Sequence, residues 1–146
     1  MSLEDWARNR WLWPHKVNRK QISGMLDIVT RDLKEAEDAN SADWKFAIAY
    51  NAALKLCTIL LNASGYRPDK LQAHFRTLQA LPLILGDERK TDADYLDTCR
   101  KTRNILEYES VGVVSEAEAT ELIQFAKRMR EDVLDWLKKN HSELLP

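Results

Sequence analysis

Residues 42–64 read ADWKFAIAYNAALKLCTILLNAS, a stretch that is apolar on almost every side of the helix it predicts. A helix with so little polar surface usually lies at the centre of a bundle, packed by neighbours on several sides. Ser41 is a suitable N-cap for it. Gly65 is expected to end it in a left-handed conformation, and Pro68 prevents its restarting at once. The stretch therefore predicts the central helix of an all-α protein.

Further helices are predicted on both sides, where apolar residues recur at helical spacing. Three of them cover residues 19–39, residues 71–85 and residues 91–108. The helix over 71–85 is expected to bend near Pro82. Its inward residues are expected to be Leu71, Phe75, Leu78 and Leu81. A capping box that begins at Ser115 opens a long final helix.

These helices predict an up-and-down bundle of four main helices, with N-terminal and short extra helices. The one β-like run, residues 111–114, is short and lies in a connection, so no sheet is expected. Residues 1–18 are expected to form an arm rich in Trp and Arg, and residues 19–146 a single domain. Aromatic side chains among cations either stack on bases or act as interface anchors when an arm packs across a dimer partner, and this packing is the favoured interpretation of the arm.

The composition limits the class of protein. The chain has 146 residues, of which 45% are hydrophobic and 31% charged, and its formal net charge is −1. These values fit one globular domain and argue against a strongly basic coat that binds nucleic acid without specificity. Cys57 and Cys99 fall on apolar helix faces and are expected to be buried free thiols in a reducing cytosol. No apolar run is expected to approach the roughly 18 residues that span a bilayer, so the chain is expected to be cytoplasmic, with no membrane partner.

The most distinctive polar segment is Arg100-Lys101-Thr102-Arg103-Asn104-Ile105-Leu106-Glu107-Tyr108. Residues four apart share a helix face, so Arg100, Asn104 and Tyr108 form one polar stripe, with Arg103 beside it. Guanidinium groups bind phosphate through paired hydrogen bonds, and an amide such as that of Asn104 is suited to position a phosphate or a ribose 2′-hydroxyl. The alternative is a solvated surface on which Arg103 pairs with Glu107 four residues later.

This segment resembles the signature of the HEPN superfamily, in which Arg and a polar residue, usually Asn, precede a His at short spacing. Residues 43–54 and 63–67 are similar to the central-helix stretch of a bacterial HEPN subgroup whose motif ends in Tyr, and the similarity extends from about Ile22 to the C-terminus. The resemblance implies an HEPN-like helical bundle that forms a homodimer through the signature helix. It also implies action on RNA without a metal or a cofactor, in a toxin–antitoxin or stress module with a nucleotidyltransferase-type antitoxin as a partner.

The resemblance assigns roles residue by residue. It implies catalytic roles for Arg103, Asn104 and Tyr108, and phosphate binding by Arg100, Lys101 and Arg103. Tyr108 occupies the position of the family's His, however. A tyrosine, with a pKa of about 10, is a poor base at neutral pH, whereas a histidine, with a pKa of about 6.5, is a good one. Ribonuclease activity is therefore expected to be weak or lost.

Two alternatives remain open at the level of sequence. His74, on the neighbouring helix, is the histidine placed to line a cleft, while no pair of histidines has the spacing of metal ligands. The competing interpretation of the whole chain is a non-catalytic homodimeric module that binds a protein or a nucleotide.

Overall fold

The computed structural model describes residues 1–108 and 112–146, except for the side chain of Tyr108. Most of this chain is helical, as the prediction of an all-α protein requires. The elements follow one another as α1 (Leu3–Arg8), β1 (Leu12–Pro14), α2 (Arg19–Asp38), α3 (Ala42–Ala63), β2 (Tyr66–Pro68), α4 (Ala73–Gln79), α5 (Leu81–Leu85), η1 (Asp87–Arg89), α6 (Lys90–Tyr108), α7 (Glu116–Asn140) and η2 (Ser142–Leu144).

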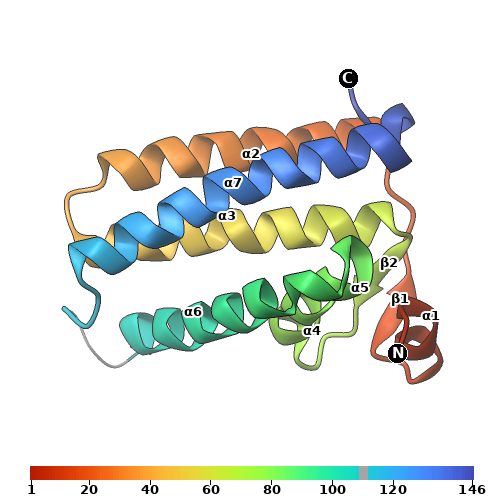
Figure 1. Cartoon of the computed structure of the whole chain (residues 1–146), viewed down its shortest axis with the longest axis horizontal. Coiled ribbons are helices and arrows are strands. Elements are labelled where there is room, and N and C mark those ends of the chain that lie inside the picture. The colour runs from red at the N-terminus through yellow and green to blue at the C-terminus, as the bar shows by residue number, and fades with distance from the viewer. Residues whose placement is uncertain (109–111) are drawn as a thin grey trace.

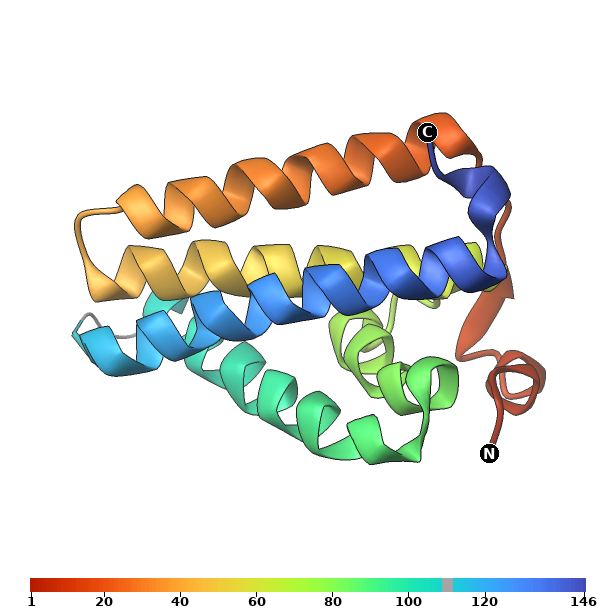
Figure 2. The ribbon, with the colours of Figure 1, turned by 45° about the horizontal axis from the view of Figure 1, so that its top comes forward.

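The long helices α2, α3, α6 and α7 form the body of the molecule (Figure 1). Each runs opposite to the one before it in sequence, and both chain termini lie at the same end of the bundle (Figure 1). Helices α2, α3 and α7 pack side by side, whereas α6 is inclined to them and shares its side of α3 with the short helices α4 and α5 (Figure 2). The inclination leaves room for α4 between α3 and α6.

Helix α3 is the central element, as its composition predicts. It packs against α2, α7, α6 and α4, and its buried residues include Tyr50, Leu56 and Leu60, each at 0% exposure. By length and composition alone α3 is also apolar enough to cross a membrane, which corrects the expectation that no stretch approaches that limit. A helix that is covered on several sides by its own bundle needs the same apolar composition, so the core position accounts for it.

Capping residues set the helix ends where the sequence predicts them. The Ser41 hydroxyl accepts a hydrogen bond from the Trp44 backbone N–H at the start of α3. Ser115 and Glu118 form the expected capping box at the start of α7. Gly65 follows α3 with φ = 98°, a left-handed backbone that a side chain disfavours. These local signals therefore act as predicted.

The predicted helix over residues 71–85 is wrong in two respects. It is divided into α4 and α5, and the break falls at Ala80 because Pro82 lacks the N–H that would continue the helical hydrogen bonds. Helix α4 also begins later than predicted, since Gln72 has a left-handed backbone with φ = 58°. Leu71, predicted to face inward, consequently lies outside the helix and is 77% exposed.

The prediction that the chain has no sheet is also wrong. Strands β1 and β2 pair in an antiparallel ribbon, with Trp13 opposite Arg67. Each strand has three residues and ends in a proline, so neither shows the alternating pattern from which a strand is recognised. Of the β-like run at 111–114, residue 111 lies outside the described residues and 112–114 form no strand.

The N-terminal arm packs against its own chain. Trp6 and Leu12 are buried with Leu61 and Ala80 in a second apolar cluster. The Arg76 guanidinium of α4 lies 3.7 Å from the centre of the Trp11 ring, and Trp13 Nε1 donates a 2.8 Å hydrogen bond to Asp69. Because the Trp11 ring is already stacked on a cation, these contacts favour packing within the chain over base stacking for the arm. Packing across a dimer partner stays a prediction.

Candidate functional site

One face of α6 packs into the bundle and positions the polar side chains at its edge. Ala93, Leu96 and Cys99 are buried on this face. Arg100 and Arg103 lie at the edge of the buried face, and each keeps 24% of its side chain exposed. Because α6 packs on both α3 and α4, the two guanidinium groups are held at the junction of the three helices.

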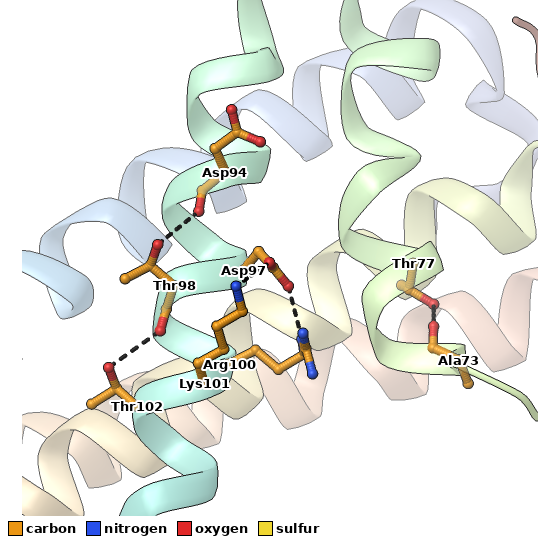
Figure 3. A network of polar contacts seen from close by, with 8 residues as sticks. All are labelled: Ala73, Thr77, Asp94, Asp97, Thr98, Arg100, Lys101 and Thr102. Atoms are coloured by element: carbon orange, nitrogen blue, oxygen red, sulfur yellow. Dashed lines mark hydrogen bonds and ion pairs between the residues drawn. The ribbon is translucent and has the colours of Figure 1, made fainter.

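Arg100 reaches from α6 toward α4 (Figure 3). Its Nε donates a 2.8 Å hydrogen bond to Asp97 Oδ1, and its guanidinium carbon lies 5.8 Å from the centre of the Phe75 ring. Lys101 Nζ is 3.5 Å from the other oxygen of Asp97, so one carboxylate serves both cations. Lys101 itself is exposed. Two cations, Arg100 and Lys101, thus share the single carboxylate of Asp97, so this group of three side chains has a net positive charge.

Arg103 pairs with Glu107 on the same helix. Its Nη1 lies 3.2 Å from Glu107 Oε2, which is the surface ion pair foreseen as the alternative for this segment. The Arg103 guanidinium carbon is also 5.9 Å from the centre of the Tyr50 ring. Arg103 therefore borders both the core and the solvent.

Tyr50 is the buried member of this group. It is 0% exposed, and its hydroxyl has no hydrogen-bond partner among the described residues. Burial raises the pKa of the Tyr50 hydroxyl well above its ordinary value, an effect that the positive charges of Arg100 and Arg103 oppose. The hydroxyl is accordingly neutral at any physiological pH.

His74 contributes an imidazole from α4. Its pKa is lowered from 6.5, mainly by partial desolvation and then by the positive charges of Arg103 and Arg100. His74 is therefore mostly neutral at pH 7 and able to accept a proton. The structure brings together the two arginines predicted as functional and the one histidine that was expected to line a cleft.

Three cavities open around these residues. The first, the α4–α6 cavity of about 670 Å³, is lined by Lys70, His74, Phe75, Asp97, Arg100 and Lys101. The second, the α3–α6 cavity of about 530 Å³, is mainly apolar, and its lining includes Trp44, Ile48, Asn51, Arg103 and Leu106. The third, the α3–α4 cavity of about 400 Å³, includes Asn51, Lys55, His74 and Thr77. His74 and Asn51 each border two cavities, so the three form one concave surface around the helix junction.

The other predicted residues are placed differently. Asn104 is exposed, borders none of these cavities and makes no side-chain hydrogen bond in the described part of the chain. The backbone of Tyr108 ends α6, but its side chain lies outside the described residues. Of the predicted stripe, Arg100 borders the α4–α6 cavity and Asn104 borders none of the three. Arg103, which lies beside the stripe, borders the α3–α6 cavity with residues from α3.

Tyr50 and Asn51 are the site residues that the sequence did not indicate. Both lie in the apolar central helix, where a hydroxyl or an amide looks like a minor interruption of the core. Their position opposite the arginines follows from the packing of α6 on α3, which helical spacing alone cannot show.

Within residues 1–108 and 112–146, no three His, Cys, Asp or Glu side chains gather as a group that could hold a metal ion. Comparison with protein-family models, with curated proteins and with solved structures finds no match to this chain. The site must therefore be interpreted from its own chemistry.

Proposed function

We propose that the chain binds single-stranded RNA through the phosphate groups, without a metal ion, using the basic edge of α6. The proposal follows the HEPN resemblance in assigning the phosphate to Arg100, Lys101 and Arg103. The observation that supports it is the pair of partly buried guanidinium groups at the rim of a concave surface. A fixed guanidinium offers a phosphate two parallel hydrogen bonds at little further cost in side-chain entropy.

The ion pairs of the free protein do not prevent this binding. A helical pair such as Arg103 with Glu107 contributes only about 0.3–0.5 kcal/mol, and Glu107 is largely exposed. A hydrogen bond to a charged group contributes about 1.5–3 kcal/mol. An incoming phosphate that makes two such bonds therefore displaces the glutamate.

The proposal includes a homodimer formed through α6. The outer face of α6 carries Asn104 and Ile105, which are both exposed, and Ile105 is an apolar side chain at 40% exposure. If two copies meet on this face, Asn104 of each copy adds an amide beside the arginines. A toxin-type role in the cytoplasm, paired with a nucleotidyltransferase-type antitoxin, extends the same proposal.

Binding of a fluorescein-labelled single-stranded RNA, followed by fluorescence anisotropy in EDTA, tests the RNA proposal. Arg103→Ala is expected to weaken binding at least 10-fold, because two charge-assisted hydrogen bonds are lost. Arg130→Ala is the matched control: Arg130 is 31% exposed and pairs with Glu131, but it lies on α7 away from the site. Equal affinities for the two variants, with both folded, contradict the proposal.

A non-catalytic module that binds a protein is the second candidate. It is favoured by the apolar lining of the α3–α6 cavity and by Trp44, which is 65% exposed at its edge. Exposed aromatic side chains beside apolar cavities are typical of protein interfaces. Analytical ultracentrifugation of Trp44→Asp, with RNA binding measured alongside, tests this role of Trp44: loss of the dimer with intact RNA binding assigns Trp44 to a protein interface and not to the RNA site.

A further inference from the structure

The position of His74 addresses the proton-transfer problem that Tyr108 leaves open. His74 lies at the start of α4 and borders both the α4–α6 cavity, with Arg100 and Lys101, and the α3–α4 cavity, with Lys55. A nucleic-acid chain that enters either of these two cavities therefore passes the imidazole. His74 lies outside residues 100–108, the segment that resembles the HEPN catalytic signature.

We propose that His74 is the general base of a ribonuclease site that α4 and α6 of a single protomer form, with Arg100 and Arg103 holding the scissile phosphate. The proposal rests on the RNA binding proposed above and adds a reaction and a residue to it. Two groups are needed for metal-independent cleavage of RNA: cations for the phosphate and a neutral base for the 2′-hydroxyl. The helix junction supplies both.

The charged groups around His74 favour this role. From α6 it faces Arg100 and Arg103, together with Asp97, whose carboxylate is already shared by Arg100 and Lys101. The neighbouring elements add charged residues to the lining of its two cavities: Lys70 before α4, Lys55 of α3 and Asp32 of α2. Asp32 accepts hydrogen bonds from Arg31. Cations therefore predominate, and after partial desolvation their charges further lower the pKa of the imidazole, which favours its neutral form.

The step balances without a metal. His74 accepts the proton of a ribose 2′-hydroxyl while the 2′-oxygen forms a bond to the adjacent phosphorus. The bond from phosphorus to the 5′-oxygen breaks, and this oxygen takes a proton from water. The products are a 2′,3′-cyclic phosphate and a 5′-hydroxyl, and the imidazolium returns its proton to solvent. Arg100 and Arg103 stabilise the extra negative charge on the phosphorane.

The test compares the full native chain with His74→Gln and with the control His15→Gln, whose histidine lies in the N-terminal arm. Each is incubated in EDTA with a 5′-labelled RNA of mixed sequence, and RNA binding is measured separately by anisotropy. His74→Gln is expected to lower the cleavage rate roughly 100-fold or more. Its affinity for RNA should change less than about threefold, because the arginines still hold the phosphate. The native product should carry a 2′,3′-cyclic phosphate.

A second measurement uses the native chain alone. The His74 pKa, followed by NMR, is expected below 6.5 in the free protein. It should rise when an oligodeoxynucleotide, which lacks the 2′-hydroxyl and is not cut, places a phosphate beside the imidazole.

The outcomes separate the two proposals. Native chain that binds RNA but never cuts it, or His74→Gln that cuts at the native rate, overturns the role of His74 and leaves RNA binding intact. Native chain that does not bind RNA overturns both. If His74→Gln does not fold, the NMR titration of the native chain still tests the proposal. A His74 pKa that is the same with and without the bound oligodeoxynucleotide refutes it.

Discussion

Replacing Tyr50 by Phe should stabilise this protein. The Tyr50 ring is fully buried in the core between α3 and α6, and its hydroxyl has no hydrogen-bond partner among the residues that the structure describes. Folding therefore strips water from the hydroxyl and returns no hydrogen bond. Phe keeps the aromatic ring and its packing and removes only the unsatisfied hydroxyl.

The expected gain follows from the cost of a buried unsatisfied polar group, which is about 1–3 kcal/mol. For a domain of this size, 1 kcal/mol moves the melting temperature by roughly 2–4 °C. A gain near the middle of the range, about 2 kcal/mol, thus raises the melting temperature by roughly 4–8 °C.

Urea denaturation followed by circular dichroism measures the change, with Tyr95→Phe as the control. Tyr95 is only partly buried and packs on Phe125 at 4.9 Å, and its hydroxyl is not among the buried groups without a partner. Its replacement should be neutral or destabilising by up to about 1 kcal/mol. A loss of stability in Tyr50→Phe would show that the hydroxyl has a partner, an ordered water included, and would refute the reasoning.

Four further predictions test the core and the site. Leu60→Ala should lower the free energy of unfolding by about 2–5 kcal/mol in urea titration, because Leu60 is 0% exposed and its truncation leaves a cavity in the core around α3. A loss below about 1 kcal/mol would contradict the central position of Leu60. Burial raises the pKa of Cys57 to about 12, so Ellman's reagent at pH 8 should modify it only as fast as the chain unfolds; immediate labelling would contradict its burial. Three phosphate contacts predict a slope near about −2 for log K of RNA binding against log salt, and Lys101→Ala should change it to about −1.4; an unchanged slope would remove Lys101 from the site. Because the pKa of His74 is lowered in the folded protein, the unfolded chain binds more protons just below pH 6.5. The free energy of unfolding should therefore fall as the pH drops below 6.5, and it should fall less in His74→Gln. The same pH dependence of stability in both proteins would contradict this.

Much of the fold was readable from local signals in the sequence. The apolar run of α3 and the capping residues Ser41, Ser115 and Gly65 act within a few residues of themselves, so they set helix positions before any tertiary contact forms. The same holds for the buried cysteines, which follow from the apolar faces of their helices. The basic segment of α6 was also visible, because its arginines recur at helical spacing.

The remaining features depend on segments that are distant in sequence. The ribbon of β1 and β2 exists because the arm and the connection after α3 pair their backbones, and neither strand carries a pattern of its own. His74 lies with Arg100 and Arg103 because α4 packs between α3 and α6, an arrangement that no spacing within one helix encodes. Local hydrogen bonds and apolar periodicity thus specify the helices, whereas burial between helices specifies which polar side chains share a site.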